Sequence, residues 1–266
     1  MSIFSLEHNN YLRKIKKEKL IVLFSQLFII ISFLLIWELL AHFHIINTFL
    51  YSCPSRILNT IIKLFFNNNL LNNIFITILE VIISFFLSTI IGIITASILW
   101  MNKITYKILD PYITILNSLP KVALGPLIII WVGASTNSII TMALTISVFT
   151  TIINIYQGFN TVNNNYIIML KSFEANKIQI FKKIIIPSNI DNIISTLKIN
   201  ISLSLIGVIM GELLVSKKGL GYLIMYGSQV FNIDLVISSI FILGIISYLM
   251  YLIVDRIHII TKKFHI

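Results

Sequence analysis

The chain has 266 residues, of which 57% are hydrophobic and only 11% are charged, and its mean hydropathy is +0.95. A soluble chain of this length needs many more polar residues to cover its surface. The composition therefore excludes a soluble enzyme, a disordered chain and a nucleic-acid-binding domain. The net charge of +10 does not indicate nucleic acid as a partner, because the basic residues cluster between apolar runs, as in a membrane protein.

Apolar runs long enough to span a bilayer recur along the chain. A spanning helix needs about 20 apolar residues, since the hydrocarbon core is about 30 Å thick. The first run is too long for a cleaved signal peptide and has no small-residue cleavage site after it, so we expect a permanent anchor. Five runs meet the length requirement: Leu20 to Ala41, Phe75 to Trp100, Ile139 to Tyr156, Ile199 to Leu214 and Leu235 to Val254.

The fourth of these runs is short but can be extended toward Asp191. A sixth run, Ile104 to Trp131, is apolar but contains Pro111, Pro120 and Pro126. Proline removes a backbone donor and kinks a helix. Such a segment is tolerated in a membrane where neighbouring helices or water satisfy the backbone. We therefore predict a bent span, and six spans in all.

The distribution of Lys and Arg predicts the orientation of these spans. With the N-terminus inside, 15 of the 20 basic residues lie on the cytoplasmic side. Six spans with both termini cytoplasmic are thus expected, in the plasma or inner membrane. The predicted parts are a segment at 1–19, one membrane domain at 20–258 with a cytoplasmic loop at about 160–193, and a tail at 259–266.

Motifs that would bind a nucleotide, a metal or a reacting substrate are missing from the sequence. No Gly-x-x-x-x-Gly-Lys-Ser/Thr loop occurs, and no Gly-x-Ser-x-Gly elbow. His42 and His44 point to different faces of a helix, which argues against a metal site. The single Cys53 cannot form an internal disulfide. We expect no catalytic, cofactor-binding or metal-binding residues, and if the protein does directed work, we expect its energy to come from elsewhere.

The loop between the fourth and fifth spans combines basic and apolar residues. Its pattern predicts two short amphipathic helices, split near Glu174 and ended by Pro187. The apolar positions of the loop could pack on a partner protein; they are Ile167, Met169, Leu170 and Phe173. Basic amphipathic helices also lie on lipid surfaces. The residues alone leave both interpretations open.

Short sequence motifs occur in this loop and, in a fixed order, along the rest of the chain. In the loop they comprise Ser172, Phe173, Ala175, Gln179, Ile180, Phe181, Lys183 and Pro187. Elsewhere they comprise Trp37-Glu38, Pro54-Ser55, Pro120-Lys121-x-Ala123-Leu124-x-Pro126-Leu127, Ile130-Trp131-x-Gly133, Leu205-Ile206-Gly207-Val208, Glu212-Leu213-Leu214 and Gly219-Leu220-Gly221-Tyr222-Leu223-Ile224. Over nearly its whole length the chain resembles ABC importer permeases of the subfamily that imports sulfonates, taurine, nitrate or vitamin precursors.

This resemblance implies an all-α type I permease fold (MetI-like) with six transmembrane helices. It also implies that two permease copies form the pore and that two ABC ATPase subunits bind their cytoplasmic loops. An extracytoplasmic solute-binding protein would deliver the solute. ATP and Mg²⁺ would bind to the ATPase, so this chain would hold no cofactor.

Particular residues of this chain are expected to have roles in such an assembly. Phe173 would be the apolar anchor in a groove of the ATPase, whereas Phe181 would brace the loop against the fifth span. The residues expected to couple the chain to the ATPase are Leu170, Lys171, Ser172, Phe173, Glu174, Ala175, Gln179, Phe181, Lys183 and Pro187. The residues expected along the translocation path are Pro120, Lys121, Pro126, Asn200 and Ser204.

The chain departs from the family pattern at three places. Ile168 to Leu170 stand where the family has Glu-Ala-Ala, and Glu174 stands where it has glycine. Glycine permits a positive φ at such a turn, which Glu adopts only at a cost in free energy. Glu80 stands where the subfamily often has a basic residue.

Charged residues inside the bilayer are expensive and usually face a partner or a cavity. For Glu38 and Glu212 we expect snorkelling or a position at the outer interface. Lys121 could line the path or pair with Glu80. Gly207 and Gly211 have the spacing that allows two helices to approach closely, so packing is expected there.

Two other classes of protein remain as alternatives to a permease. One is a scaffold subunit of a larger membrane complex, and the other is a secondary transporter. A secondary transporter would be favoured by an inverted repeat, and no internal repeat is found. Copurification of an ATPase would separate these alternatives.

Overall fold

The structure is a computed structural model that describes residues 6–66 and 69–264. Every regular element in these ranges is a helix, as the apolar runs predicted. The chain divides into two compact units, Met1–Lys63 and Leu64–Ile266, which are described separately.

The first unit contains the long helix α1 (Leu6–His42) and the short helices α2 (Thr48–Tyr51) and α3 (Pro54–Phe66). Large apolar side chains of α1 are exposed, as with Phe28 at 72%, which suits a helix surrounded by lipid. Glu38 accepts hydrogen bonds from the backbone N–H (3.1 Å) and the hydroxyl (2.8 Å) of Ser55. A carboxylate stabilises the positive end of a helix. Glu38 thus binds the first turn of α3, and its position at the outer interface stays a prediction.

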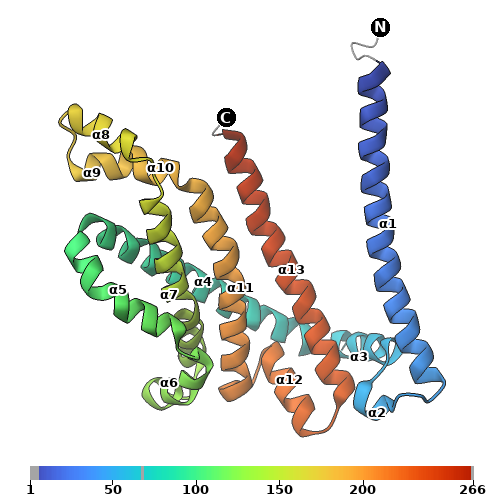
Figure 1. The fold of residues 1–266 in the computed structure, drawn as a ribbon. Coiled ribbons are helices and arrows are strands. Elements are labelled where there is room, and N and C mark those ends of the chain that lie inside the picture. Colours follow the sequence, from blue (N-terminus) through green and yellow to red (C-terminus); the bar gives the residue numbers. More distant parts are fainter. Residues whose placement is uncertain (1–5, 67–68, 265–266) are drawn as a thin grey trace. The chain divides into compact units, whose positions relative to one another are not determined.

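The centre of the second unit is built from α4 (Asn69–Met101), α7 (Thr136–Asn160) and α11 (Ile190–Val215), with α7 packed on both other helices (Figure 1). The close approach of α11 to α7 depends on Gly207 and Gly211. A Cβ atom on Gly211 would lie 2.9 Å from the Cα atom of Ile139, and one on Gly207 would collide with Ala143. The packing role predicted for these glycines is confirmed.

The proline-rich run forms a broken pair of helices. It consists of α5 (Lys103–Ser118), the 3-10 turn η1 (Lys121–Leu124) and α6 (Gly125–Val132). The two parts meet at 88°. Pro120 precedes η1 and Pro126 occupies the first turn of α6, where a missing N–H costs nothing. The predicted bend is thus a sharp break at Pro120, and Pro126 lies in the helix that follows it.

The second unit is completed by α12 (Leu220–Gln229) and α13 (Ile233–Phe264), which pack on each other. Among the described residues, five helices are long and apolar enough to cross a membrane, and the broken pair makes a sixth if it is one span. The five runs predicted as spans are confirmed. Each of the five helices, α1, α4, α7, α11 and α13, is longer than the apolar run that predicted it.

Candidate functional site

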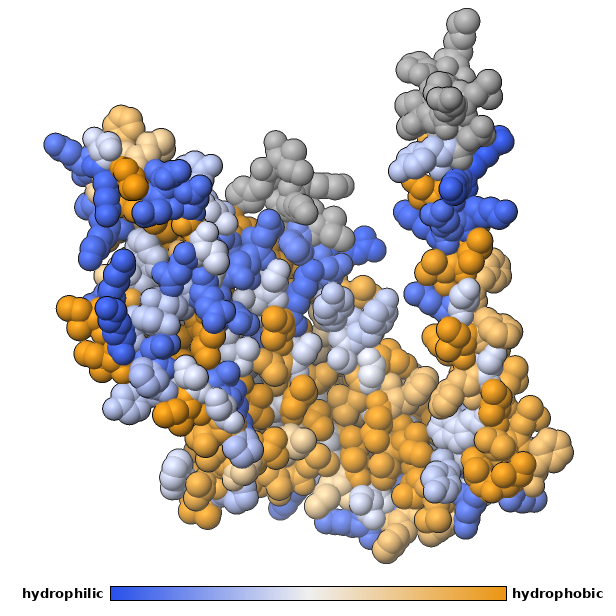
Figure 2. Space-filling view, in the orientation of Figure 1, coloured by the Kyte–Doolittle hydropathy of each residue, from blue (hydrophilic) through white to orange (hydrophobic). Residues whose placement is uncertain are grey.

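The polypeptide between α7 and α11, residues 161–189, is called the α7–α11 loop below. It contains α8 (Asn164–Ser172), α9 (Lys177–Ile180), the π-helical turn η2 (Phe181–Ile185) and α10 (Ile186–Ser188). Hydrophilic side chains gather over this part of the molecule, whereas apolar side chains dominate over α12 and the adjoining part of α13 (Figure 2). The loop therefore lies outside the apolar band of its unit.

A tight turn separates α8 from α9. The N–H of Glu174 donates to Lys171 O (2.9 Å) and that of Ala175 donates to Leu170 O (3.1 Å). These two bonds form the Schellman motif, whose turn residue is usually glycine with a positive φ. Glu174 has a φ of 59°, so the predicted strain at this position is confirmed. The turn directs the chain sharply from one helix into the next.

The beginning of α9 is fixed by two reciprocal hydrogen bonds. The Gln179 N–H donates to Asn176 Oδ1 (2.9 Å), and the Asn176 N–H donates to Gln179 Oε1 (2.8 Å). This arrangement is a capping box, which satisfies backbone donors that the helix leaves free. Gln179 thus has a local structural role that explains its place in the motif.

The two phenylalanines of the motif have opposite environments. Phe173 lies at the turn and is 76% exposed, whereas Phe181 is 7% exposed. The ring centroid of Phe181 lies 5.3 Å from that of Trp100 on α4 and 5.3 Å from that of Phe159 on α7. Aromatic pairs at this separation stabilise a core beyond their buried area. Phe181 thus fastens the loop to α4 and α7, and Ile193 of α11, the fifth span, packs against the same buried cluster.

Pro187 does not end a helix, contrary to the sequence-based expectation. The Ile186 N–H donates to Phe181 O, which is the wider spacing of a π-helical turn. Pro187 then lies in the first turn of α10, and the helical chain continues to Ser188. The wider turn accommodates the proline, which lacks a donor for the regular ladder.

The remaining residues expected to contact an ATPase are mostly accessible. Leu170 and Ala175 are half-buried beneath the turn. The exposed members of the set are Lys171, Ser172, Phe173, Glu174, Gln179, Lys183 and Pro187. The loop therefore presents exposed side chains at and after the turn that carries Phe173, whereas Phe181 is buried against α4 and α7.

The intramembrane lysine has partners other than the one considered from the sequence. Lys121 Nζ donates to Asn117 Oδ1 (2.9 Å) and to Ile146 O (2.9 Å). The Thr150 hydroxyl donates to the same Asn117 oxygen (3.1 Å). A pairing of Lys121 with Glu80 is therefore wrong. The lysine instead joins the α5–α6 break to α7, and Pro120 and Pro126 beside it are exposed.

Asn200 and Ser204, also expected along a path, are buried between helices of this subunit. Asn200 is 1% exposed. Its Oδ1 accepts a hydrogen bond from the Ser88 hydroxyl (3.2 Å), and its Nδ2 donates one to Thr89 Oγ1 (2.6 Å). Ser204 is fully buried, and its hydroxyl has no hydrogen-bond partner among the described residues. Asn200 thus links α11 to α4 by hydrogen bonds that are favourable away from water.

A second polar group connects α4, α11 and α12. Glu212 is 1% exposed and accepts from the Thr77 hydroxyl (2.7 Å) and the Gly221 N–H (2.6 Å). Thr77 Oγ1 in turn accepts from the Leu220 N–H (2.9 Å). The free donors at the start of α12 are thereby satisfied inside the protein. Snorkelling of Glu212 is wrong, because its carboxyl group binds the first turn of α12.

Glu80 faces Glu212 in this group and is 1% exposed. Its Oε2 atom has no hydrogen-bond partner among the described residues. Two buried carboxylates in contact repel each other unless a proton or a cation lies between them. A basic residue at this position, as in the subfamily pattern, would form an ion pair with Glu212 instead.

The sequence reasoning missed the residues of α4 that complete this group. The Gly219 N–H donates to Asn73 Oδ1 (2.6 Å), and Gly219 has a φ of 104° that permits the approach. The available signal was a polar stripe at helical spacing in an apolar helix. It consists of Asn73, Thr77, Glu80, Ser84 and Ser88, all of them buried.

Comparison with known proteins identifies the family. Residues 88–262 match the family model described as the binding-protein-dependent transport system inner membrane component, so the chain belongs to this family. It is an ABC transporter permease of the type found in importers.

Curated relatives agree with this assignment. A probable ABC transporter permease protein of Haemophilus influenzae is 27% identical over 88% of this chain and 94% of its own length. The formylaminopyrimidine transport permease protein ThiX of Halalkalibacterium halodurans is 28% identical over 61% of this chain and 65% of its own. The putative aliphatic sulfonates transport permease protein SsuC of Bacillus subtilis is 25% identical over 80% and 78%.

The fold agrees with a solved ABC transporter. A chain of the MetNI methionine ABC transporter, in an inward-facing conformation, superposes with a TM-score of 0.64 over 71% of this chain and 94% of that chain. The sequence identity is 17%, so this likeness concerns the fold alone. It confirms the predicted all-α permease architecture.

Proposed function

We propose that this chain forms the solute passage of an ATP-driven importer and binds a separate ATPase through the α7–α11 loop. The observation that carries the proposal is the contrast within that loop. Phe173 is exposed at a sharp turn, while Phe181 fixes the same loop to α4 and α7. An exposed aromatic on a firmly held turn suits docking into a groove of a partner, where such residues dominate binding energies.

The proposed assembly follows the family. Two copies of this chain would form the passage, two ATPase subunits would bind their loops, and an external binding protein would deliver the solute. ATP would be bound and hydrolysed by the ATPase alone. Relatives named for formylaminopyrimidine and aliphatic sulfonate transport support a small organic solute of the sulfonate, taurine, nitrate or vitamin-precursor class. Within the subunit, Pro120, Lys121 and Pro126 at the α5–α6 break are the path residues we propose.

The docking proposal is tested by the substitution Phe173→Ala. Losing a buried aromatic anchor should weaken ATPase binding by about 2 kcal/mol or more, which is roughly thirtyfold. The measurements are retention of the ATPase in a pull-down and solute-stimulated ATP hydrolysis in liposomes. Trp131→Ala is a matched control, because Trp131 is also 76% exposed but lies on α6. Normal retention and normal stimulation with Phe173→Ala would contradict docking and favour a loop that lies on lipid.

The proposed orientation places both termini and the α7–α11 loop in the cytoplasm. Reporter fusions after Asn47, Ser135 and Ser228 should read as external, and fusions after Asn102, Asn165 and Lys263 as cytoplasmic. The decisive position is Ser135, which follows the broken pair of helices. A cytoplasmic reading there would show that this pair re-enters the membrane without crossing it.

A further inference from the structure

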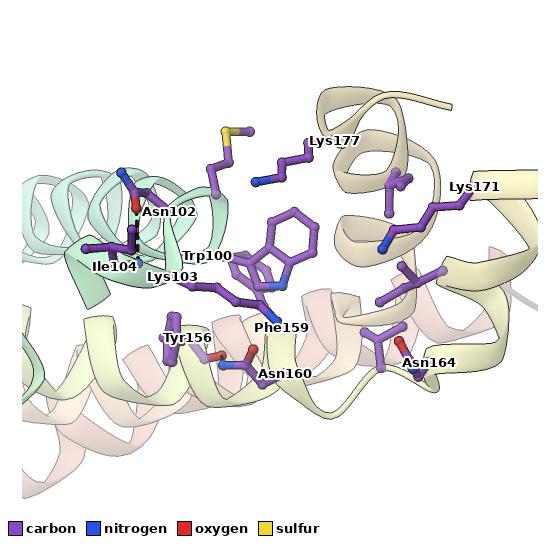
Figure 3. Close-up of a pocket in the computed structure, with 14 residues that line it drawn as sticks. Trp100, Asn102, Lys103, Ile104, Tyr156, Phe159, Asn160, Asn164, Lys171 and Lys177 are labelled. Atoms are coloured by element: carbon purple, nitrogen blue, oxygen red, sulfur yellow. Dashed lines mark hydrogen bonds between the residues drawn. The ribbon is translucent and has the colours of Figure 1, made fainter. Parts of the chain in front are cut away.

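A basic cavity lies beside the α7–α11 loop. Its volume is about 750 Å³, and it is lined by the α4–α5 connection, the end of α7 and the helices α8 and α9. Lysines from three separate helices line it: Lys103 of α5, Lys171 of α8 and Lys177 of α9. In Figure 3 the side chains of Lys171 and Lys177 extend toward Trp100, and that of Lys103 extends toward Phe159 and Asn160.

The charge of this cavity is unbalanced. None of the described residues that line it is acidic, so three ammonium groups share the space without a carboxylate. A cleft lined by one sign of charge with low-dielectric walls concentrates ions of the opposite sign. Such an arrangement fits an anion that carries more than one acceptor oxygen.

Tertiary packing, and not proximity in the sequence, brings Lys103 close to the two lysines of the loop. Lys103 is distant in sequence from Lys171 and Lys177, and the contact between Trp100 and Phe181 fastens their elements to one another. Asn102 adds an orientated amide. Its Oδ1 accepts from the N–H groups of Ile104 (3.1 Å) and Thr105 (3.2 Å), so the group that it can offer a ligand is the NH₂ donor.

The position of the cavity along the membrane normal indicates where such an anion comes from. Trp100 belongs to the last turn of the spanning helix α4, and tryptophan prefers the level of the lipid headgroups. Basic pockets between membrane helices on the cytoplasmic side bind the headgroups of anionic lipids. Lysine binds phosphate as a compact point charge.

We propose that this cavity binds a phosphate group, supplied by the headgroup of an anionic phospholipid or by free phosphate. A phosphate held by Lys103, Lys171 and Lys177 ties α8 and α9 to the α4–α5 connection, on both sides of the turn that carries Phe173. This lipid or phosphate site is separate from the proposed function and rests on it only for placing the cavity at the cytoplasmic leaflet. It is testable without any ATPase, so a failure of docking would leave it standing.

The test compares two double variants of the full chain in detergent. Lys103→Gln with Lys177→Gln removes one cavity lysine from α5 and one from the loop. Lys107→Gln with Lys182→Gln is the matched control, because these exposed lysines also lie on α5 and in the loop but outside the cavity. Bound phosphatidylglycerol and phosphatidylcholine are counted by native mass spectrometry, with and without an excess of inorganic phosphate.

We expect the wild type to retain phosphatidylglycerol over phosphatidylcholine, and the cavity variant to bind it about 25-fold more weakly, from about fivefold for each lysine. The control should change little. Displacement of the lipid by inorganic phosphate would identify a general phosphate site, and resistance to it would identify a lipid site. Equal binding by the cavity variant and the control would overturn the proposal. If the cavity variant does not fold, Lys103→Arg with Lys177→Arg must retain binding while each single Lys→Gln variant loses it.

Discussion

Phe173 and Phe181 belong to the same loop, yet the first is 76% exposed and the second 7%. Around Phe173 the chain satisfies its backbone locally, through the Schellman turn between α8 and α9. Around Phe181 it depends on distant residues, through Trp100 and Phe159. The two phenylalanines of one motif thus have different structural roles. The difference teaches that a family motif can combine a surface for a partner with the support that holds this surface in place.

The largest expected effect comes from removing the support. Phe181→Ala should destabilise the second unit by roughly 3–5 kcal/mol, because it leaves a cavity among buried aromatic and aliphatic side chains. Thermal unfolding of the purified chain in detergent measures this. Phe173→Ala should change stability by no more than about 0.5 kcal/mol, since its ring is exposed. Equal unfolding temperatures for both variants would contradict the assignment of a supporting role to Phe181 and a surface role to Phe173.

A smaller effect is expected from the caps of the two helices. Asn176→Ala should destabilise the start of α9 by about 1 kcal/mol, since it removes the acceptor for the Gln179 N–H. Hydrogen exchange should become faster at the start of α9 and remain unchanged in α8. Asn163→Ala is the corresponding variant for α8, because Asn163 Oδ1 accepts a hydrogen bond from the Asn165 N–H (2.9 Å) at the start of that helix. Faster exchange throughout the loop in both variants would show that its halves are not independent.

The smallest effect is expected at the turn itself. Glu174→Gly should leave the chain as stable or more stable by up to about 1 kcal/mol, because glycine adopts a φ of 59° without strain. Glu174→Ala is the control, since alanine keeps the strain and also loses the carboxylate. Unfolding temperature and ATPase retention are measured together. A large loss of the ATPase with both variants would reveal a required contact of the Glu174 carboxylate.

Much of this could be predicted from the sequence, because the responsible signals are local. The spans follow from unbroken apolar runs, and the strain at Glu174 follows from its place in a motif that has glycine there. The packing of Gly207 and Gly211 follows from their spacing on one helix face, which the contacts with Ala143 and Ile139 confirm. Each of these inferences needs only residues that are near in the chain.

The contacts that the sequence did not indicate join residues that are far apart in the chain. The contact of Glu80 with Glu212, the bonds of Lys121 to Asn117 and Ile146 O, and the contacts of Phe181 with α4 and α7 all depend on how helices pack. Hydropathy shows that a helix is buried in lipid but not which helix lies beside it. Likewise, the π-helical turn before Pro187 is a tertiary adjustment that a proline alone does not indicate.

The sharp break between α5 and α6 has a mechanical consequence. If the proposed docking holds, a displacement applied at Phe173 would pass through Phe181 to α4 and α7 together, and α7 meets α11 across glycines that leave little room for sliding. These three helices should therefore tilt as one rigid plate. At the 88° break Pro120 lacks a backbone donor, so a change of angle there would disrupt few backbone hydrogen bonds. We therefore expect this break to act as a joint of the unit, and Lys121 lies directly at it, bonded to Ile146 O of α7.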